Sequence, residues 1–220
     1  MSRKQINIPK VLEFSWLKTE RLAETISALK HQKLKQFLEL TGNVYPDLVK
    51  VFYTNLTLDR KNLVSYVKGI KMKVINDVWN SVAGIKYSGL KVGKGNINGI
   101  QEFNKIQYYR SCVRNLAQSV NGFHAGNLTL TPSLVAYIIA WQLIPRGTNH
   151  VVLHKEDLIL LYCIMNLIKV NWVYIIMEHT LKSKRLIDYT FTTKKYVKSG
   201  GFNMAVINNR HKFQYNTSFH

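Results

Sequence analysis

The most constraining feature of this sequence is the uneven distribution of its charges. The chain of 220 residues has 31 Lys and Arg against 12 Asp and Glu, a formal charge of +19. Between Asn115 and Ile168 the charges sum to zero, because only Arg146, Lys155, Glu156 and Asp157 are charged there. With 46% hydrophobic residues overall, this neutral block can form the interior of one sizeable core. We therefore expect one folded domain with basic margins and not a disordered chain.

Apolar residues recur at three- and four-residue spacing in several stretches, which predicts amphipathic helices. One helix is expected over Glu20 to Leu40, with Gly42 as its C-terminal stop, and a second over about Pro46 to Leu56. A third helix, apolar nearly all round and therefore central, is expected from Thr131 to Pro145.

The apolar run from Leu158 to Met177 is about as long as a bilayer span requires. Asn166, Lys169 and Asn171 lie near its centre, where each polar group is costly in lipid. We therefore expect two buried helices instead of a membrane span. The first begins with two acidic residues, which suit the helix macrodipole, and ends near Lys169, and Asn171 caps the second.

One segment departs from the helical pattern. From about Leu63 to Val74 apolar residues alternate with basic ones around Lys68-Gly69, which predicts a β-hairpin with a glycine turn. A short helix capped by Asn76 is expected next, closed by Gly84, and the glycine-rich run from Tyr87 to Gly99 is expected to be an exposed loop. The predicted fold is mainly α: a single helical domain with one small β-hairpin.

The cysteines and the N-terminal residues indicate the compartment. Cys112 and Cys163 lie far apart in different apolar surroundings, which fits reduced core thiols better than a disulfide framework. Residues 1–20 show neither the continuous apolar stretch nor the cleavage site of a secretory signal. We therefore expect an intracellular protein, in the nucleus or the cytoplasm, with no membrane partner.

The sequence offers little for catalysis. A polynucleotidyl transferase needs three carboxylates that converge on two metal ions, and no Asp of this chain lies in a suitable alternating strand. His150 and His154 could lie one helical turn apart, but no further ligand motif accompanies them, so turn or helix-end roles fit better. The glycine-rich run also misses both phosphate-binding glycine patterns. The expectation is a protein that is not an enzyme and holds neither cofactor nor metal, and no small-molecule substrate is indicated.

Two basic clusters remain as candidate nucleic-acid-binding surfaces. Lysines interleaved with aromatic residues suit a polyanion, because phosphate neutralisation supplies affinity and aromatic rings stack on bases. The alternative is that both are solvated faces of a basic protein. The hairpin cluster comprises Lys61, Lys68, Lys71 and Lys73 beside Tyr66, and the C-terminal cluster comprises Lys182, Lys184, Arg185, Lys194, Lys195 and Lys198 around Tyr189, Phe191 and Tyr196.

Three segments carry a family resemblance: VYPDLVKVFYTNL (Val44 to Leu56), SYVKGIKMKVINDVWNSVAGI (Ser65 to Ile85) and the stretch from Asn127 to Leu181. They show, in order, an FYxNL helix end, a V-x-G hairpin, a short Trp-bearing helix, and an L-x-P-x-G-T-x-H turn before a Leu-rich helix. In this order the features resemble the plant transposon protein domain of plant retrotransposon-derived, gag-like reading frames.

The resemblance spans roughly Val44 to Val197 and implies a plant transposable-element origin, with no established catalytic residues. It divides the chain into an N-terminal basic segment with an amphipathic helix (1–43), a plant transposon-like helical domain (44–200) and a tail (201–220). The expected function is that of a non-catalytic, element-derived protein that binds RNA or DNA non-specifically or self-associates. The alternatives are a degenerate transposase or nuclease relic, dependent on Asp59 or Asp77, and a folded remnant without activity.

Overall fold

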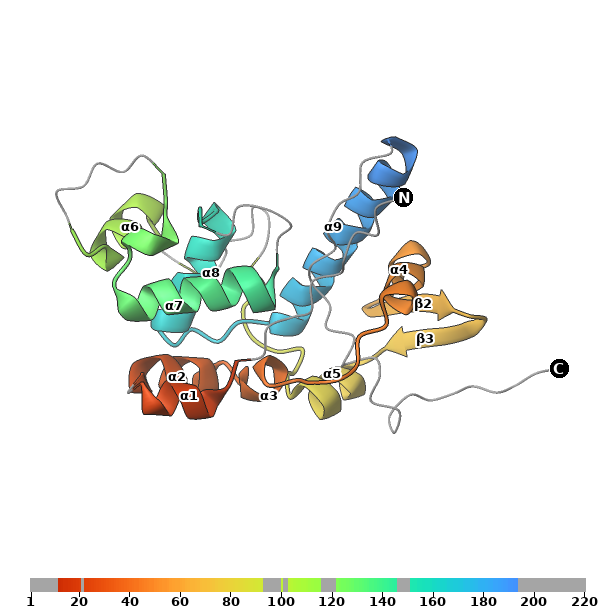
Figure 1. Cartoon of the computed structure of the whole chain (residues 1–220), viewed down its shortest axis with the longest axis horizontal. Helices are drawn as coiled ribbons and strands as arrows, with labels where there is room; N and C mark the ends of the chain where they lie inside the picture. The colour runs from red at the N-terminus through yellow and green to blue at the C-terminus, as the bar shows by residue number, and fades with distance from the viewer. Residues whose placement is uncertain are drawn as a thin grey trace.

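The structure, a computed structural model, describes residues 12–20, 22–92, 100, 103–115, 122–145 and 151–193, with backbone alone at residues 19 and 185–193. Helices enclose the core, and one small antiparallel sheet lies at its edge (Figure 1). The elements are α1 (Phe14–Thr19), α2 (Ala23–His31), α3 (Lys35–Leu38), α4 (Pro46–Thr54), β1 (Thr57–Asp59), β2 (Asn62–Val67), β3 (Ile70–Val74), α5 (Asn76–Ala83), α6 (Lys105–Cys112), a 3-10 turn (Ala125–Asn127), α7 (Leu130–Ile138), a π-helical turn (Ile139–Leu143), α8 (Lys155–Met165) and α9 (Trp172–Thr193). The predicted mainly α fold is confirmed.

The described residues of the neutral block contribute two helices to the hydrophobic core. Its helices α7 and α8 pack against each other, and both contact α2, while α6 packs on α8 (Figure 1). Val135, Ile139 and Leu161 are completely buried there. The low charge of this stretch therefore reflects its position in the interior, where an unpaired charge is expensive.

The helix predicted over residues 20–40 is wrong in one respect, because it is broken into α2 and α3. The chain turns at Gln32 and Lys33, and Lys33 has a left-handed φ of +58°. The apolar spacing continues through the break, since Leu29 and Leu34 are both completely buried on its two sides. Periodicity alone therefore could not reveal the turn.

The side chain of Gln32 explains the break between α2 and α3. Its amide nitrogen donates to the carbonyl oxygen of Ile168 at 2.7 Å, and its amide oxygen accepts from Val170 N at 3.1 Å and from the Trp172 indole at 3.2 Å. Gln32 is only 3% exposed. These long-range hydrogen bonds hold the residue in the turn and join it to the α8–α9 connection.

The predicted hairpin is confirmed, and it gains a strand that the sequence did not indicate. β2 pairs with β3 through a two-residue turn in which Lys68 and Gly69 have φ of +51° and +81°, as a type I′ turn requires. β1 pairs with the other edge of β2, across a turn at Arg60. All three residues of β1 are exposed, so no alternation of apolar residues signals the strand.

The two faces of this sheet have different surroundings. Leu63, Ser65 and Val67 of β2 are buried on the inner face, and the Ser65 hydroxyl donates to Phe52 O of α4 at 2.8 Å. Successive side chains of a strand point to opposite faces, so Tyr66 and its neighbours belong to the outer face. The packing on α4 therefore holds the face of Leu63, Ser65 and Val67 against the core, while Val64, on the face of Tyr66, is also buried at 3% exposure.

Two predicted helices differ from the structure in detail. α5 begins at Asn76, so Ile75 and not Asn76 occupies the N-cap position, and Gly84 closes the helix with φ +69° as predicted. α7 begins at Leu130 and widens at its C-terminal end into a π-helical turn, where Ile144 N donates to Ile139 O at 2.9 Å. This hydrogen bond joins residues five positions apart, as in a π-helix, whereas an α-helix joins residues four positions apart.

The glycine-rich run is irregular over residues 87–92, as predicted, with Ser88, Gly89 and Lys91 exposed, but it is anchored to the core at two positions. Leu90 forms a parallel bridge with Val170, and Val92 is 5% exposed. The bridge depends on Gly89, whose φ is +105° and whose backbone lies against Lys169 O and Val170. Residues 93–99 lie outside the described residues.

The apolar run at residues 158–177 forms two helices, as predicted. α8 ends at Met165, and Asn171 caps α9 by accepting a hydrogen bond from Tyr174 N at 3.0 Å. Asp157 in the first turn of α8 accepts a hydrogen bond from His154 N at 2.6 Å. Among the helices that the structure describes, none combines the length and apolar character needed to cross a membrane.

Replacing Gly89 with alanine should destabilise the protein. The new Cβ would lie 2.7 Å from Lys169 O and 2.8 Å from the carbonyl carbon of Val170, in a left-handed conformation, and we expect the free energy of unfolding to fall by about 1–3 kcal/mol. Gly126→Ala is the matched control, because its Cβ would meet nothing within 4 Å. Urea denaturation of both variants checks this, and equal losses would contradict it.

Replacing Gln32 with methionine should cost more than the same change at Gln36. Gln32→Met leaves several buried backbone and indole groups without partners, so we expect a loss of about 3 kcal/mol or more in the free energy of unfolding. Gln36 donates to Val82 O at 2.8 Å from an exposed position, and its loss should cost about 1 kcal/mol. Thermal and urea denaturation compare the two, and similar destabilisation by both would count against the role assigned to Gln32.

Candidate nucleic-acid interface

The outer face of the sheet exposes an aromatic ring among lysines. Tyr66 and Lys71 are cross-strand partners in β2 and β3, and Tyr66 is 50% exposed. The Lys71 ammonium lies 6.0 Å from the centroid of the Tyr66 ring, at the limit of a cation–π contact. The alternation that predicted the hairpin therefore also places these two side chains together.

Lys73 lies on the same face but is already paired. Its ammonium is 3.4 Å from the carboxylate of Asp59 in β1, and the two side chains are 43% and 48% exposed. An ion pair at this exposure contributes little to stability, on the order of 0–1 kcal/mol. Lys73 therefore carries a charge that Asp59 partly offsets, whereas Lys71 has no recorded carboxylate partner among the described residues.

The two turns of the sheet add basic side chains at its ends. Lys68 occupies the β2–β3 turn, and Arg60 and Lys61 form the β1–β2 turn, all three exposed. Arg60 was not among the residues predicted to contact nucleic acid, although its position next to Lys61 was a usable signal. We call the hairpin cluster together with Arg60 and Tyr66 the hairpin surface.

The C-terminal cluster is only partly described, and one member has a structural role. The ammonium of Lys184 donates to Leu56 O at 2.6 Å, directly after α4, and α9 packs along α4. This contact holds the half-buried Lys184 against the segment that joins α4 to β1, and Lys182 is half-buried as well. For Arg185, Tyr189 and Phe191 the structure describes the backbone alone, and Lys194, Lys195, Tyr196 and Lys198 lie outside the described residues.

Asp59 and Asp77, the residues considered for metal-dependent cleavage, belong to no acidic cluster among the described residues. Asp59 pairs with Lys73, Asp47 lies 3.3 Å from Lys50, and Asp77 is exposed in the first turn of α5. Within the described ranges no three His, Cys, Asp or Glu side chains are grouped to hold a metal ion. His154 lies at the start of α8, as expected for a helix-end histidine, and residue 150 is outside the described residues.

The two cysteines are free and buried, as predicted for core thiols. Burial raises the pKa of the Cys163 thiol to about 11. Burial also raises the pKa of Tyr108, with a smaller contribution from the neighbouring Cys112. The thiolate is the nucleophilic form of cysteine, so Cys163 is a poor nucleophile at neutral pH.

We expect Lys184 to stabilise the folded protein and Lys182 to contribute little to its stability. Lys184→Met removes a charge-assisted hydrogen bond from a half-buried site, so the free energy of unfolding should fall by about 1–2 kcal/mol. Lys182→Met, two residues away on the same helix, removes the same charge and should cost less than about 0.5 kcal/mol. Urea denaturation measures both, and an equal loss in the two variants would refute the structural role of Lys184.

Neither the curated proteins nor the solved structures include a significant match. The family described as "Putative plant retrotransposon-related domain" matches residues 30–191, which contain the sheet, the neutral helical core and nearly all of α9. This match covers most of the chain and agrees with the segments that carried the resemblance. The chain therefore belongs to this plant retrotransposon-related family.

Proposed function

We propose that this retrotransposon-related protein is non-catalytic and binds nucleic acid without sequence specificity through the hairpin surface. The observation that supports the proposal most strongly is the half-exposed ring of Tyr66 beside the Lys71 ammonium, on a sheet whose β2 strand packs on α4 through its other face. A ring held in this way offers a stacking platform, and the adjacent lysine offers a phosphate contact.

The charge of the hairpin surface favours a polyanion. Five basic residues lie between positions 59 and 73, and Asp59 is the single acid. A protein that neutralises phosphates releases the counterions condensed on the nucleic acid, and this release supplies most of the affinity in non-specific binding. The outward-facing lysines and the positive net charge also speed the encounter with a polyanion.

The kinds of side chain on this surface favour binding without sequence readout. Lysine is a flexible point charge, and stacking on tyrosine tolerates every base. Base-specific contacts typically come from bidentate Arg, Asn or Gln side chains held in a groove. On the hairpin surface Arg60 alone has a bidentate head, and it lies exposed in a turn.

Binding of fluorescent single-stranded RNA and DNA, measured by anisotropy at several salt concentrations, tests the proposal. Removing two lysines with the double variant Lys68→Gln/Lys71→Gln should reduce the slope of log K against log salt by about 1.4, since each single-strand contact contributes about 0.7. Tyr66→Val keeps a strand-forming residue and should weaken binding by about 1–3 kcal/mol with the slope unchanged.

The matched control is Lys18→Gln/Lys155→Gln, which removes the same charge from exposed positions in α1 and α8. Its salt slope should equal that of the parent protein. Identical slopes for the two double variants would rule out the hairpin surface as the contact. Cleavage of the oligonucleotide in the presence of divalent metal ions, lost in Asp59→Asn/Asp77→Asn, would overturn the non-catalytic assignment.

A further inference from the structure

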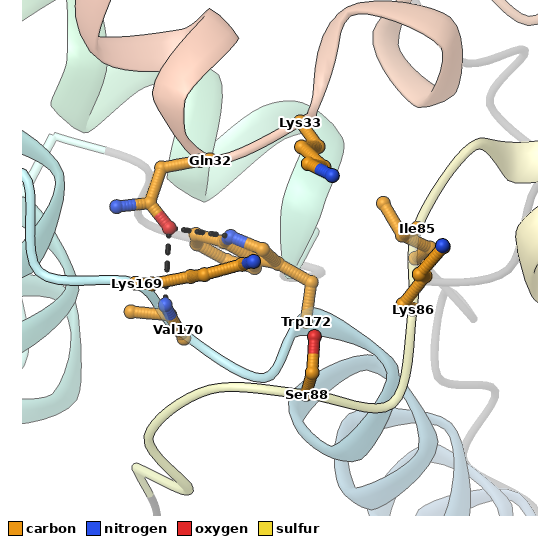
Figure 2. A pocket seen from close by; sticks show the side chains of 8 residues that line it. All are labelled: Gln32, Lys33, Ile85, Lys86, Ser88, Lys169, Val170 and Trp172. Atoms are coloured by element: carbon orange, nitrogen blue, oxygen red, sulfur yellow. Dashed lines mark hydrogen bonds between the residues drawn. The ribbon is translucent and has the colours of Figure 1, made fainter.

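Three lysines from segments far apart in the sequence line one surface pocket outside the hairpin surface (Figure 2). Lys33 follows α2, Lys86 follows α5, and Lys169 precedes α9. Figure 2 shows Lys33 and Lys169 extending toward the space beside the Trp172 indole, with Lys86 on the opposite wall. The remaining lining residues are Gln32, Ile85, Ser88 and Val170, none of them acidic.

The walls of this pocket are fixed by buried hydrogen bonds. Gln32 bonds to Val170 N and to the Trp172 indole, and Trp172 is 1% exposed. Leu90 N donates to Lys169 O at 2.8 Å, which ties the segment after Lys86 to the segment of Lys169. The three lysine backbones are therefore held around one space by the core, although their side chains are exposed.

The charges around the pocket lack compensation. None of the three lysines takes part in an ion pair recorded among the described residues. Like charges brought to one site repel each other, and an anion between them would relieve the repulsion. Trp172 is also the first residue of α9, so the positive end of that helix dipole adds to the same field.

The size of the pocket limits the ligand. The pocket is shallow, because its roughly 260 Å³ of empty space includes open solvent at the mouth, and it encloses far less than the roughly 300–1,000 Å³ of typical small-molecule sites. A whole nucleotide would exceed it, whereas a single phosphate group can meet the lysine ammonium groups, with the exposed Ser88 hydroxyl as a neutral donor.

We propose that the pocket formed by Lys33, Lys86 and Lys169 binds one phosphate group. The group is either a free phosphate compound or a phosphate of a nucleic acid, and the chemistry of recognition is the same for both. The proposal rests on residues that the hairpin surface does not include, so it stands or fails independently of the function proposed above.

Titration of the ¹⁵N-labelled full-length chain with inorganic phosphate, at constant ionic strength set by chloride, tests this site. The indole N–H of Trp172 donates to Gln32 at the pocket, so its NMR resonance should shift in a saturable way. In Lys33→Gln/Lys169→Gln the apparent phosphate affinity should fall by about tenfold or more, because the variant removes two charged donors from the pocket. The Lys18→Gln/Lys155→Gln control should titrate like the parent protein.

Two further arms identify the source of the phosphate and check the fold. An oligonucleotide without terminal phosphates that shifts the Trp172 resonance indicates a backbone phosphate, whereas a shift only with a 5′-phosphorylated oligonucleotide indicates chain-end recognition. Without phosphate, Lys33→Gln/Lys169→Gln should unfold at the same temperature as the parent or higher, because it removes repulsion. The hairpin variant Lys68→Gln/Lys71→Gln should keep the phosphate response. No saturable shift in the parent protein, or an equal shift in the pocket variant, would overturn the proposal.

Discussion

The side-chain amide of Gln32 is the interaction on which the arrangement of the rest depends. It supplies partners to Ile168 O, Val170 N and the Trp172 indole, groups that lie between the end of α8 and the start of α9. Backbone groups at helix ends have no partner within the helix and need one elsewhere when buried. The amide therefore fixes the point from which α9 leaves the core. Because α9 then packs on α4 and bonds to Leu56 through Lys184, the place of the sheet follows from it.

The parts of the fold that could be predicted are those decided by local pattern. Helical spacing located α4, α8 and α9, and alternation around Lys68-Gly69 located the hairpin. The differences from the prediction occur where distant contacts override the pattern: Gln32 breaks a regular apolar repeat by binding residues more than 130 positions away, and Leu90 pairs with Val170. β1 could not be predicted because all its side chains are exposed, so it shows no apolar alternation. It is a strand only through its backbone pairing with β2.

The residues of the candidate sites also fall into those that a local pattern predicts and those that only tertiary contacts bring together. Tyr66 and Lys71 could be placed on one face from the sequence, because residues opposite each other in a hairpin share a face. The role of Lys184 could not, since its partner is the carbonyl of Leu56, 128 positions earlier. The lysine pocket could not be predicted from the sequence either, because Lys33, Lys86 and Lys169 line one space only after α2, α5 and α9 have packed. Composition indicated a basic surface, whereas the positions of its charges depend on tertiary structure.

The separation of a neutral core from basic margins has a thermodynamic consequence. The ion pairs recorded within the described ranges, such as Lys35–Glu39 and Lys73–Asp59, are exposed and stabilise little. With 31 Lys and Arg against 12 Asp and Glu, most basic residues have no carboxylate to pair with, and their mutual repulsion favours the unfolded chain. A polyanion bound to the folded surface removes part of that repulsion and stabilises the native state by mass action. Under the proposed function, salt therefore acts in two opposite ways: it weakens the binding of a polyanion, and it screens the repulsion within the free domain and so stabilises the fold.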